Sequence, residues 1–597
     1  MSFSALAVGI ARWSMPTVPM GTSINVLRNL RNRRRNFSNT IFRHSRWQDW
    51  RDMPADKGCV TLTSPLHGHE ITHGQGERMY DLLLTNGRIV DGTGQTWFRA
   101  ALGITRDVVT IIKGDASQVQ AGRVIDVAGM VVCPGFIDMH SHSELKLMTE
   151  PEHQAKVRQG VTTEAIGMDG LSYAPISSPK LEHLLTYLAA INGTPPPDVR
   201  WSSVKEFLDI LDGRAACNVA FMVPHAAIRI EAMGWEDRAP TPQELAHMQE
   251  LARQGMQDGA FGFATGLTYP PGAYSDTDEL VAVCQAISDL GGFYMTHARY
   301  TKGDQLLDPF REALEIGQRG GVPVHISHYH SPVDGMGERM IGLVDEGRNA
   351  GVDVTFDQYP YAAASTVLHS LLPYWVHAGG PAAALERIKQ TETRERIGDS
   401  VNPMWGNTLD DYIFSHIGSD KNKEWEGRSL TDLADFQSKK MVDAICDLLI
   451  EENLEVAFVA RTGNPTNIRT IVRHPAHMVG SDGVLTGEMP NPRTYGTFPF
   501  VLGQFAREEG LFPMEDAVRK MTALPAQRLG IQDRGILRDG MKADVVVFNP
   551  DTVEAKATFD DPKQYPVGIN YVIVNGELVI DNGVHTGTLP GRALKSQ

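Results

Sequence analysis

The chain has 597 residues, of which 42% are hydrophobic and 21% charged, a balance typical of a globular protein with a large buried core. Its formal net charge of -16 argues against a nucleic-acid partner, because phosphate binding requires clustered lysine and arginine. The five cysteines form no C-x-x-C pair, and no stretch approaches the roughly 20 apolar residues that span a membrane. We therefore expect a cytoplasmic protein that binds neither membrane nor nucleic acid. The sequence leaves homo-oligomerisation open.

The N-terminal segment differs from the rest in composition. Residues 1–48 contain no aspartate or glutamate, whereas five arginines cluster between residues 28 and 35 near several serines. This pattern is typical of a mitochondrial transit peptide. The alternative is an overlong start, because folded-looking sequence begins with "MYDLLLTNGRIVDGTG" at Met79. Under either interpretation, residues 1–78 are predicted to be poorly ordered and outside the fold.

Short β-branched runs broken by glycine-containing turns occupy residues 79–131 and return in residues 531–597. About 400 residues of a different pattern separate these two segments. We predict one small β-sandwich domain built from both ends of the chain.

Residues 132–530 alternate short apolar runs with longer amphipathic stretches, which predicts an α/β fold. The runs read as strands are 131–138, 161–167, 218–223, 260–264, 293–297, 323–327, 353–357 and 476–480. Eight successive strand-then-helix units indicate a TIM-like (β/α)8 barrel. About 117 residues separate Asp357 from His474, far more than one crossover requires. We therefore predict a mostly helical insertion, about residues 365–460, over the barrel mouth.

His140 and His142 stand two residues apart in "CPGFIDMHSHSE", at the end of the first predicted barrel strand. Residues i and i+2 of an extended strand share a face, so both imidazoles can converge on one metal ion. Three further residues able to bind metal end later apolar runs, namely His297, His328 and Asp482. Catalytic residues of TIM barrels lie at the C-terminal ends of the strands, so the pattern predicts a metal site there.

Two residues near these positions have simpler interpretations. Alternation places His328 and His330 on one strand face and His325 on the other, so we interpret His325 as structural. Asp482 in "GSDG" could cap the next helix, but the histidines at the ends of the other predicted strands favour a catalytic role.

From Tyr80 to the C-terminus, the chain resembles the D-aminoacylase (N-acyl-D-amino-acid deacylase) family of the metal-dependent amidohydrolase superfamily. The segments that carry the resemblance include "GVTTEAIGMDGLSYAP", "GAFGFATGLTYPPG", "VTFDQYPYAAAST", "NPRTYGTFPFVLG" and "DRGILRDGMKADVVVF". The resemblance implies hydrolysis of a non-peptide amide bond in a small molecule, an N-acyl-D-amino acid, to a carboxylate and a free D-amino acid. It also implies zinc, one or two ions per chain, in a barrel joined to a small β-domain.

The resemblance also implies the metal ligands. It assigns the tightly held zinc to His297 and His328, and a second metal position to His140, His142 and Asp482. The family has Asn-Cys-Gly with a zinc-binding cysteine after the second strand, where this chain has Met168-Asp169-Gly170. Because a carboxylate can bind or bridge zinc, we expect Asp169 to replace the cysteine and a two-metal site to form. A turn-forming Asp-Gly is the alternative.

For catalysis, we expect Asp482 to take a proton from water and to deliver it to the leaving amine. For substrate binding, Arg493 resembles the arginine that holds the substrate carboxylate, a role suited to a guanidinium. Where the family has a lysine, this chain has His330, which carries charge only conditionally at neutral pH. Tyr359 and Tyr361 resemble the tyrosine-bearing segment that binds or polarises substrate.

Three other functions fit the sequence less well. Cyclic-amide hydrolases such as hydantoinase and dihydroorotase bridge their metals with a carboxylated lysine after the fourth strand, and "GAFGFATGLTYPPG" contains no lysine. A deaminase fits the superfamily but not the match along the whole chain. A noncatalytic scaffold tends to lose metal-binding residues, whereas the histidines and Asp482 are all present in this sequence.

Overall fold

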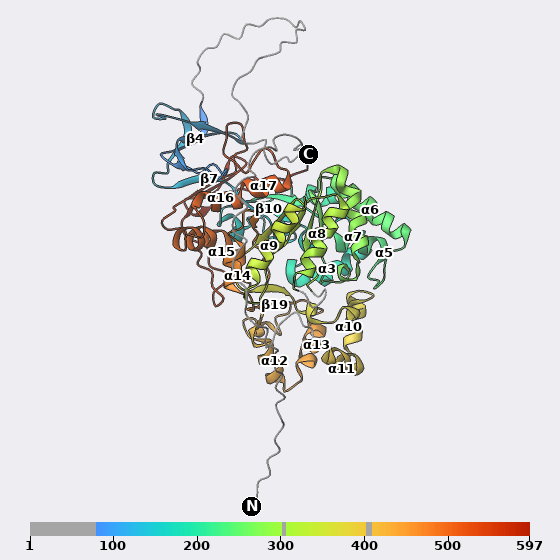
Figure 1. Cartoon of the computed structure of the whole chain (residues 1–597). Coiled ribbons are helices and arrows are strands. Elements are labelled where there is room, and N and C mark those ends of the chain that lie inside the picture. Colours follow the sequence, from blue (N-terminus) through green and yellow to red (C-terminus); the bar gives the residue numbers. More distant parts are fainter. Residues whose placement is uncertain (1–78, 301–305, 401–408, 597) are drawn as a thin grey trace, which may run out of the picture. The chain divides into compact units, whose positions relative to one another are not determined.

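The computed structural model describes residues 79–300, 306–400 and 409–596 (Figure 1). The two interpretations of residues 1–78 concern a segment outside the described residues. Within the described ranges, no helix combines the length and the apolar character needed to cross a membrane.

Strands from both ends of the described chain form one sheet, with the order β25-β24-β23-β22-β7-β2-β3 (Figure 1). Its bounds are β2 (Arg88–Ile89), β3 (Phe98–Arg99), β7 (Val131–Pro134), β22 (Val545–Phe548), β23 (Ile569–Val574), β24 (Glu577–Asp581) and β25 (Val584–His585). The antiparallel pairing of β22 with β7 joins the two chain ends. A second sheet, in the order β5-β4-β1-β6, consists of β1 (Tyr80–Thr85), β4 (Ala101–Thr105), β5 (Val108–Ile112) and β6 (Ala121–Asp126). Leu84, Leu102 and Val547 belong to one buried cluster, so the two sheets share a core.

Parallel strands carry the candidate site. They form the orders β11-β10-β8 and β12-β13-β14-β15-β16-β20. Their bounds are β8 (Phe136–Asp138), β10 (Val161–Ile166), β11 (Asn218–Phe221), β12 (Val223–Pro224), β13 (Gly262–Gly266), β14 (Phe293–His297), β15 (Val324–Ile326), β16 (Val354–Gln358) and β20 (His477–Val479). Backbone hydrogen bonds link the two sheets at both ends, from Phe261 N, just before β13, to Phe221 O of β11 (2.8 Å) and from Met139 N, just after β8, to Val479 O of β20 (3.3 Å). Beyond them, the short strands β9 (Ser141–His142) and β21 (Gly483–Val484) also pair in parallel.

Helices separate successive strands, as the amphipathic stretches predict. They are α1 (Lys146–Thr149), α2 (Gln154–Val157), α3 (Ser178–Asn192), α4 (Val204–Leu211), α5 (His225–Met233), α6 (Pro242–Gln257), α7 (Thr277–Ile287), α8 (Asp308–Gly320), α9 (Met336–Asn349), α14 (Pro465–Ile471), α15 (Arg493–Phe500), α16 (Met514–Met521) and α17 (Ala523–Leu529). Local sequence fixes some of their ends. Helix α6, for example, begins with a capping box, in which the Thr241 side chain accepts from Glu244 N and Glu244 bonds back to Thr241 N.

All eight predicted strand positions are strands, and β14 has the predicted bounds. The prediction of one strand over 131–138 was wrong, because the chain changes sheets at Gly135. Strand β7 belongs to the sheet of the chain ends and β8 to the parallel strands. A Cβ at Gly135 would lie 2.1 Å from Thr162 Oγ1, so only glycine fits where the chain crosses.

The predicted insertion contains a sheet as well as helices, so its description as mostly helical was incomplete. Its antiparallel order is β17-β19-β18, with β17 (Ala364–Val367), β18 (Tyr412–Ile417) and β19 (Val456–Ala460). Its helices are α10 (Pro381–Ile388), α11 (Thr391–Asp399), α12 (Leu430–Gln437) and α13 (Met441–Glu451), which gather near β19 in Figure 1. These elements bury a separate apolar cluster that includes Phe414, Leu449 and Phe458.

A histidine of this insertion makes stability depend on pH. His377 packs against Tyr187 of α3, with ring centroids 5.8 Å apart, and burial lowers the pKa of His377 to about 4. The unfolded chain, with an ordinary histidine pKa of about 6.5, binds more protons between these values, so stability falls as pH falls. Between pH 7 and pH 5, we expect the free energy of unfolding to fall by about 2 kcal/mol less in His377→Gln than in the wild type. Urea denaturation at both pH values measures this. The exposed His183→Gln is the control, and an unchanged pH dependence in His377→Gln would contradict the prediction.

Candidate metal centre and active site

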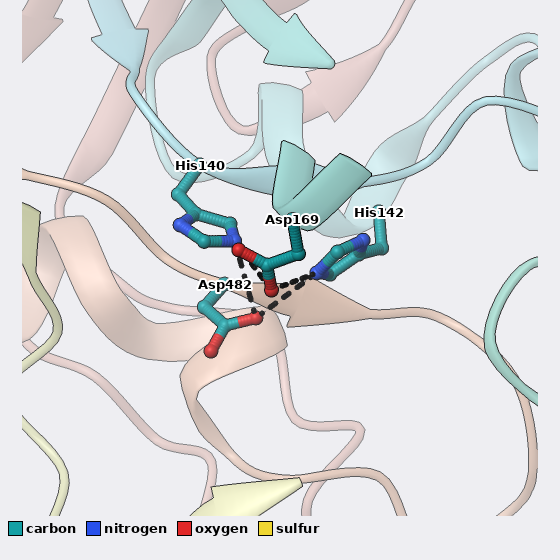
Figure 2. Close-up of side chains that lie close together, drawn as sticks. All are labelled: His140, His142, Asp169 and Asp482. Atoms are coloured by element: carbon teal, nitrogen blue, oxygen red, sulfur yellow. Dashed lines mark ion pairs between the residues drawn. The ribbon is translucent and has the colours of Figure 1, made fainter. Parts of the chain in front are cut away.

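Four buried side chains from three parts of the chain converge at the ends of the parallel strands (Figure 2). His140 follows β8 and His142 ends β9, and their Nε2 atoms point the same way, as the H-x-H spacing predicts. Each Nε2 lies 3.5 Å from Asp169 Oδ2. The distances from Asp482 Oδ1 to these atoms are 3.6 Å for His140 and 3.3 Å for His142. Two imidazoles and two carboxylates therefore surround one point.

A second group adjoins the first and shares Asp169 with it. His297 ends β14 and His328 follows β15, and His297 Nδ1 lies 2.9 Å from His328 Nε2. Asp169 Oδ2 lies 3.7 Å from that His297 atom and 3.6 Å from that His328 atom. One carboxylate oxygen therefore faces ring nitrogens of four histidines, and both groups could hold a metal ion.

Unusual backbone conformations aim three of these side chains. Asp169, His328 and Asp482 have φ values of 55°, 32° and 48°, in the left-handed region that non-glycine residues rarely adopt. Each follows a parallel strand, so the chain turns sharply there. Space is tight beside Asp169, since a Cβ at Gly167 would lie 2.2 Å from Met222 O. Such strain persists only where the surrounding structure imposes it, and it is concentrated at functional sites.

The electrostatics of the site favour a cation. Burial acts against charged imidazoles, but Asp169 and Asp482 raise the pKa of His142 to about 9, and the carboxylates raise the pKa of His140 well above its ordinary value. Burial acts against the charged carboxylate too, yet His140 and His328 hold the pKa of Asp169 well below its ordinary value. Among the described residues, no hydrogen-bond partner is found for four buried atoms of the site, which are both ring nitrogens of His140, Nδ1 of His142 and Oδ1 of Asp169. Nitrogen and oxygen donors of this kind suit zinc, which would replace the protons on the imidazoles.

A further carboxylate, Asp357 of β16, supports the site from behind and was missed in the sequence. Its Oδ1 accepts from His328 N (2.9 Å), and its Oδ2 lies 3.6 Å from His140 Nδ1. His325 Nε2 lies 3.0 Å from the same Oδ2, so His325 helps to hold Asp357 in place. His325 belongs to neither of the two groups that could bind metal. Outer carboxylates of this kind orient ligand imidazoles. The sequence did contain a signal for this role, because Asp357 is a charged residue at the end of the predicted strand in "VTFDQ".

Loop residues near the second histidine group were also missed. Thr268 Oγ1 lies 2.5 Å from His297 Nε2, and Tyr300 Oη lies 3.2 Å from His328 Nδ1. Each contact occupies the ring nitrogen that faces away from Asp169. Both residues follow strands in irregular segments, where no periodicity marks them.

A cavity of about 340 Å³ opens onto the metal-capable residues. Tyr359, Tyr361 and His330 line it, as do residues 363–366, where the insertion begins, and residues 462–464, which follow it. His330 Nδ1 lies 2.5 Å from His328 O, and burial together with nearby His328 lowers the pKa of His330 to about 4. His330 is therefore uncharged at neutral pH.

Arg493, at the first position of α15, lies behind the wall of this cavity. The side chain is fully buried, its Nη2 lies 2.8 Å from Asp482 Oδ2, and its guanidinium stacks over Tyr359 at 4.3 Å from the ring centroid. Burial acts to raise the pKa of the Asp482 carboxyl, but the nearby Arg493 and His140 outweigh it and hold this pKa well below its ordinary value. His225, by contrast, pairs with Glu279 (2.8 Å) and does not line the cavity.

Comparison with known proteins identifies the family. The Amidohydrolase family model matches residues 123–395 and 406–580. D-aminoacylase of Alcaligenes xylosoxydans xylosoxydans is 35% identical over 526 residues, which cover 86% of this chain and 97% of that protein. The N-acyl-D-glutamate deacylase of Bordetella bronchiseptica, solved with zinc and a phosphonate that mimics the tetrahedral intermediate, superimposes with a TM-score of 0.74. It is 32% identical and covers 87% of this chain and 100% of its own. A crystal structure of D-aminoacylase gives a TM-score of 0.71 at 32% identity, covering 86% of this chain and 100% of that one. The predicted resemblance is thus confirmed, and the chain belongs to the amidohydrolase family, within the group of D-aminoacylase and the N-acyl-D-amino-acid deacylases.

Proposed function

We propose that this protein hydrolyses the amide bond of N-acyl-D-amino acids with zinc as its cofactor. The observation that carries the proposal is the position of Asp169 Oδ2, within 3.7 Å of ring nitrogens of His140, His142, His297 and His328. Relatives whose names state this activity support the substrate class.

The proposed metal positions follow from the two groups. His297, His328 and Asp169 would hold one zinc, and His140, His142 and Asp482, again with Asp169, would hold a second. Zinc bound there lowers the pKa of a water molecule and polarises the scissile carbonyl.

In this proposal Asp482 moves the proton. Its Oδ2 is held by Arg493, which leaves Oδ1 facing the H-x-H pair. That oxygen would take the proton from the attacking water and deliver it to the amine nitrogen, which leaves as a neutral amine because an amide anion is too basic to expel.

Arg493 would also bind the carboxylate of the substrate. Its Nε and Nη1 are buried and have no hydrogen-bond partner among the described residues. Unpaired guanidinium donors suit a carboxylate, whereas the uncharged His330 can offer only a neutral hydrogen bond. Tyr359, beneath the guanidinium, and Tyr361 would complete the pocket.

For the architecture, we propose a closed (β/α)8 barrel that begins with β8, after the change of sheet at Gly135, and ends near residue 530, with the insertion of residues 365–460. Ile137 of β8, Met295 of β14 and Met478 of β20 belong to one buried cluster, as the interior of a closed barrel requires. Residues 79–134 and 531–597 would form the small β-sandwich.

The experiment that tests the function measures zinc by mass spectrometry and hydrolysis of N-acetyl-D- and N-acetyl-L-amino acids. We expect bound zinc, hydrolysis of the D-series only, loss of activity with a chelator and recovery with zinc. Zinc without hydrolysis of either series contradicts the proposal, and cleavage of dihydrouracil or hydantoins would then identify a cyclic-amide hydrolase.

The cavity also predicts the preferred side chain. Its described lining includes Leu171, Ile191, Phe310, Val333 and Ile468, and no lysine or arginine among the described residues. An acidic side chain would lose its water there without a partner, at a cost of about 1–3 kcal/mol or more. We expect kcat/KM for N-acetyl-D-leucine and N-acetyl-D-phenylalanine to exceed that for N-acetyl-D-glutamate by about 100-fold. Equal or higher kcat/KM for the glutamate derivative would contradict this.

A further inference from the structure

A buried lysine outside the proposed catalytic machinery lies beneath it. Lys156, in α2, is fully buried, as are Asp138 at the end of β8 and Ser481 after β20. The Lys156 ammonium donates to Asp138 Oδ2 (2.7 Å), Ser141 Oγ (3.1 Å) and Ser481 Oγ (2.5 Å). An ammonium has three protons, and these three acceptors account for all of them.

The partners of Lys156 belong to two different loops. Asp138 begins the loop that carries the H-x-H pair, and Ser481 immediately precedes Asp482. The other carboxylate oxygen of Asp138, Oδ1, accepts from His140 N (3.2 Å) and from Ser481 N (2.8 Å). In addition, Asp482 N donates to His140 O (2.8 Å). Lys156 is therefore bonded to both sides of the junction between the first and last parallel strands.

The local packing leaves room for this ammonium and little else. A Cβ at Gly483, the residue after Asp482, would lie 2.7 Å from Lys156 Nζ. Ser481 Oγ also accepts from Gly483 N (3.1 Å) while donating to Asp138 Oδ2 (2.6 Å). Residues on either side of Asp482 thus contact the lysine or its partners.

Charge alone does not explain a lysine here. Asp138 and Glu164, whose Oε1 lies 3.2 Å from Nζ, compensate the ammonium, but apolar side chains of similar volume often replace buried ion pairs without loss of stability. What an apolar side chain lacks is directional bonding to two loops at once. The strained φ of 48° at Asp482 needs such an anchor.

We propose that Lys156 is a positioning residue that, through Asp138 and Ser481, holds Asp482 in register with His140 and His142. This inference rests on the proposed function only where kcat is the quantity measured. Lys156 makes no contact with the cavity and takes no proton in the reaction.

The test compares Lys156→Met and Ser481→Ala with Lys520→Met. Lys520 is also fully buried, but its ammonium donates to His474 O (2.7 Å) away from the site. Displacing a catalytic group by about 1 Å costs about 100-fold in rate. We expect kcat per zinc-loaded protein to fall about 100-fold in Lys156→Met and about 10-fold in Ser481→Ala, with KM changed less than about threefold. Lys520→Met should keep its kcat even if its Tm falls.

A second readout does not depend on hydrolysis. In cobalt-substituted protein, the visible spectrum follows the geometry of the ligands, so it should change in Lys156→Met and Ser481→Ala but not in Lys520→Met. If Lys156→Met does not fold, Ser481→Ala decides. Wild-type kcat and an unaltered cobalt spectrum in Ser481→Ala would overturn the inference. An inactive wild type would instead overturn the proposed function, and the cobalt spectrum would still test whether Lys156 positions the ligands.

Discussion

Replacing Asp482 by asparagine is expected to lower kcat for N-acyl-D-amino acids by about 1,000-fold, within the range for loss of a general acid–base. Asparagine keeps the shape of the side chain and an oxygen for Arg493, but it cannot carry a proton from water to the amine. The measurement is kcat per bound zinc, with zinc content determined by mass spectrometry and folding by Tm.

The matched control is Asp345→Asn. Asp345 also pairs with a histidine, His474, at 3.1 Å, but its side chain is 62% exposed and remote from the cavity. Its kcat should equal that of the wild type. Full kcat in Asp482→Asn with normal zinc would exclude Asp482 as the proton carrier and leave only a structural role for its bond to Arg493.

The sequence predicted the parallel strands and the residues at their ends for a simple physical reason. A strand buried on both faces appears as a continuous apolar run, and the chemistry begins where that run stops. His297 and Asp482 were found in this way, and β14 ended at the predicted residue. The H-x-H spacing similarly predicted that the two imidazoles face one point, because alternate residues of a strand share a face. Both Nε2 atoms do so, although His140 lies between β8 and β9 and not in a strand.

Features that depend on contacts distant in the sequence could not be predicted in this way. The change of sheet at Gly135 depends on the close approach of Thr162 and on pairing with β22, some 400 residues later. The run "VAFVA" of β19 is too short to distinguish a strand from a buried helix. Asp357 and Lys156 have no periodicity of their own, and their roles depend on partners from other strands.

Asp169 tests the interpretation of the site most directly, because it stands where the resemblance implies a zinc-binding cysteine. The sequence left two roles open, a turn-forming Asp-Gly and a replacement metal ligand. The structure contains the turn, with φ of 55° at Asp169, and the same turn directs Oδ2 toward both histidine groups. The turn and metal binding are therefore compatible roles for Asp169.

If Asp169 bridges two zinc ions, Asp169→Ala should lose most of its zinc and lower kcat by at least about 100-fold, since four histidines would remain without their shared anion. Asp169→Cys should retain zinc, because thiolate is a softer ligand that zinc also accepts, with kcat within about 10-fold of the wild type. Zinc content and kcat of both variants measure this, with Asp345→Ala as the control. If the residue only formed the turn, Asp169→Asn, which tolerates a positive φ as well as aspartate, would keep full zinc and activity. That result would remove the bridging role and leave metal binding to the histidines and Asp482.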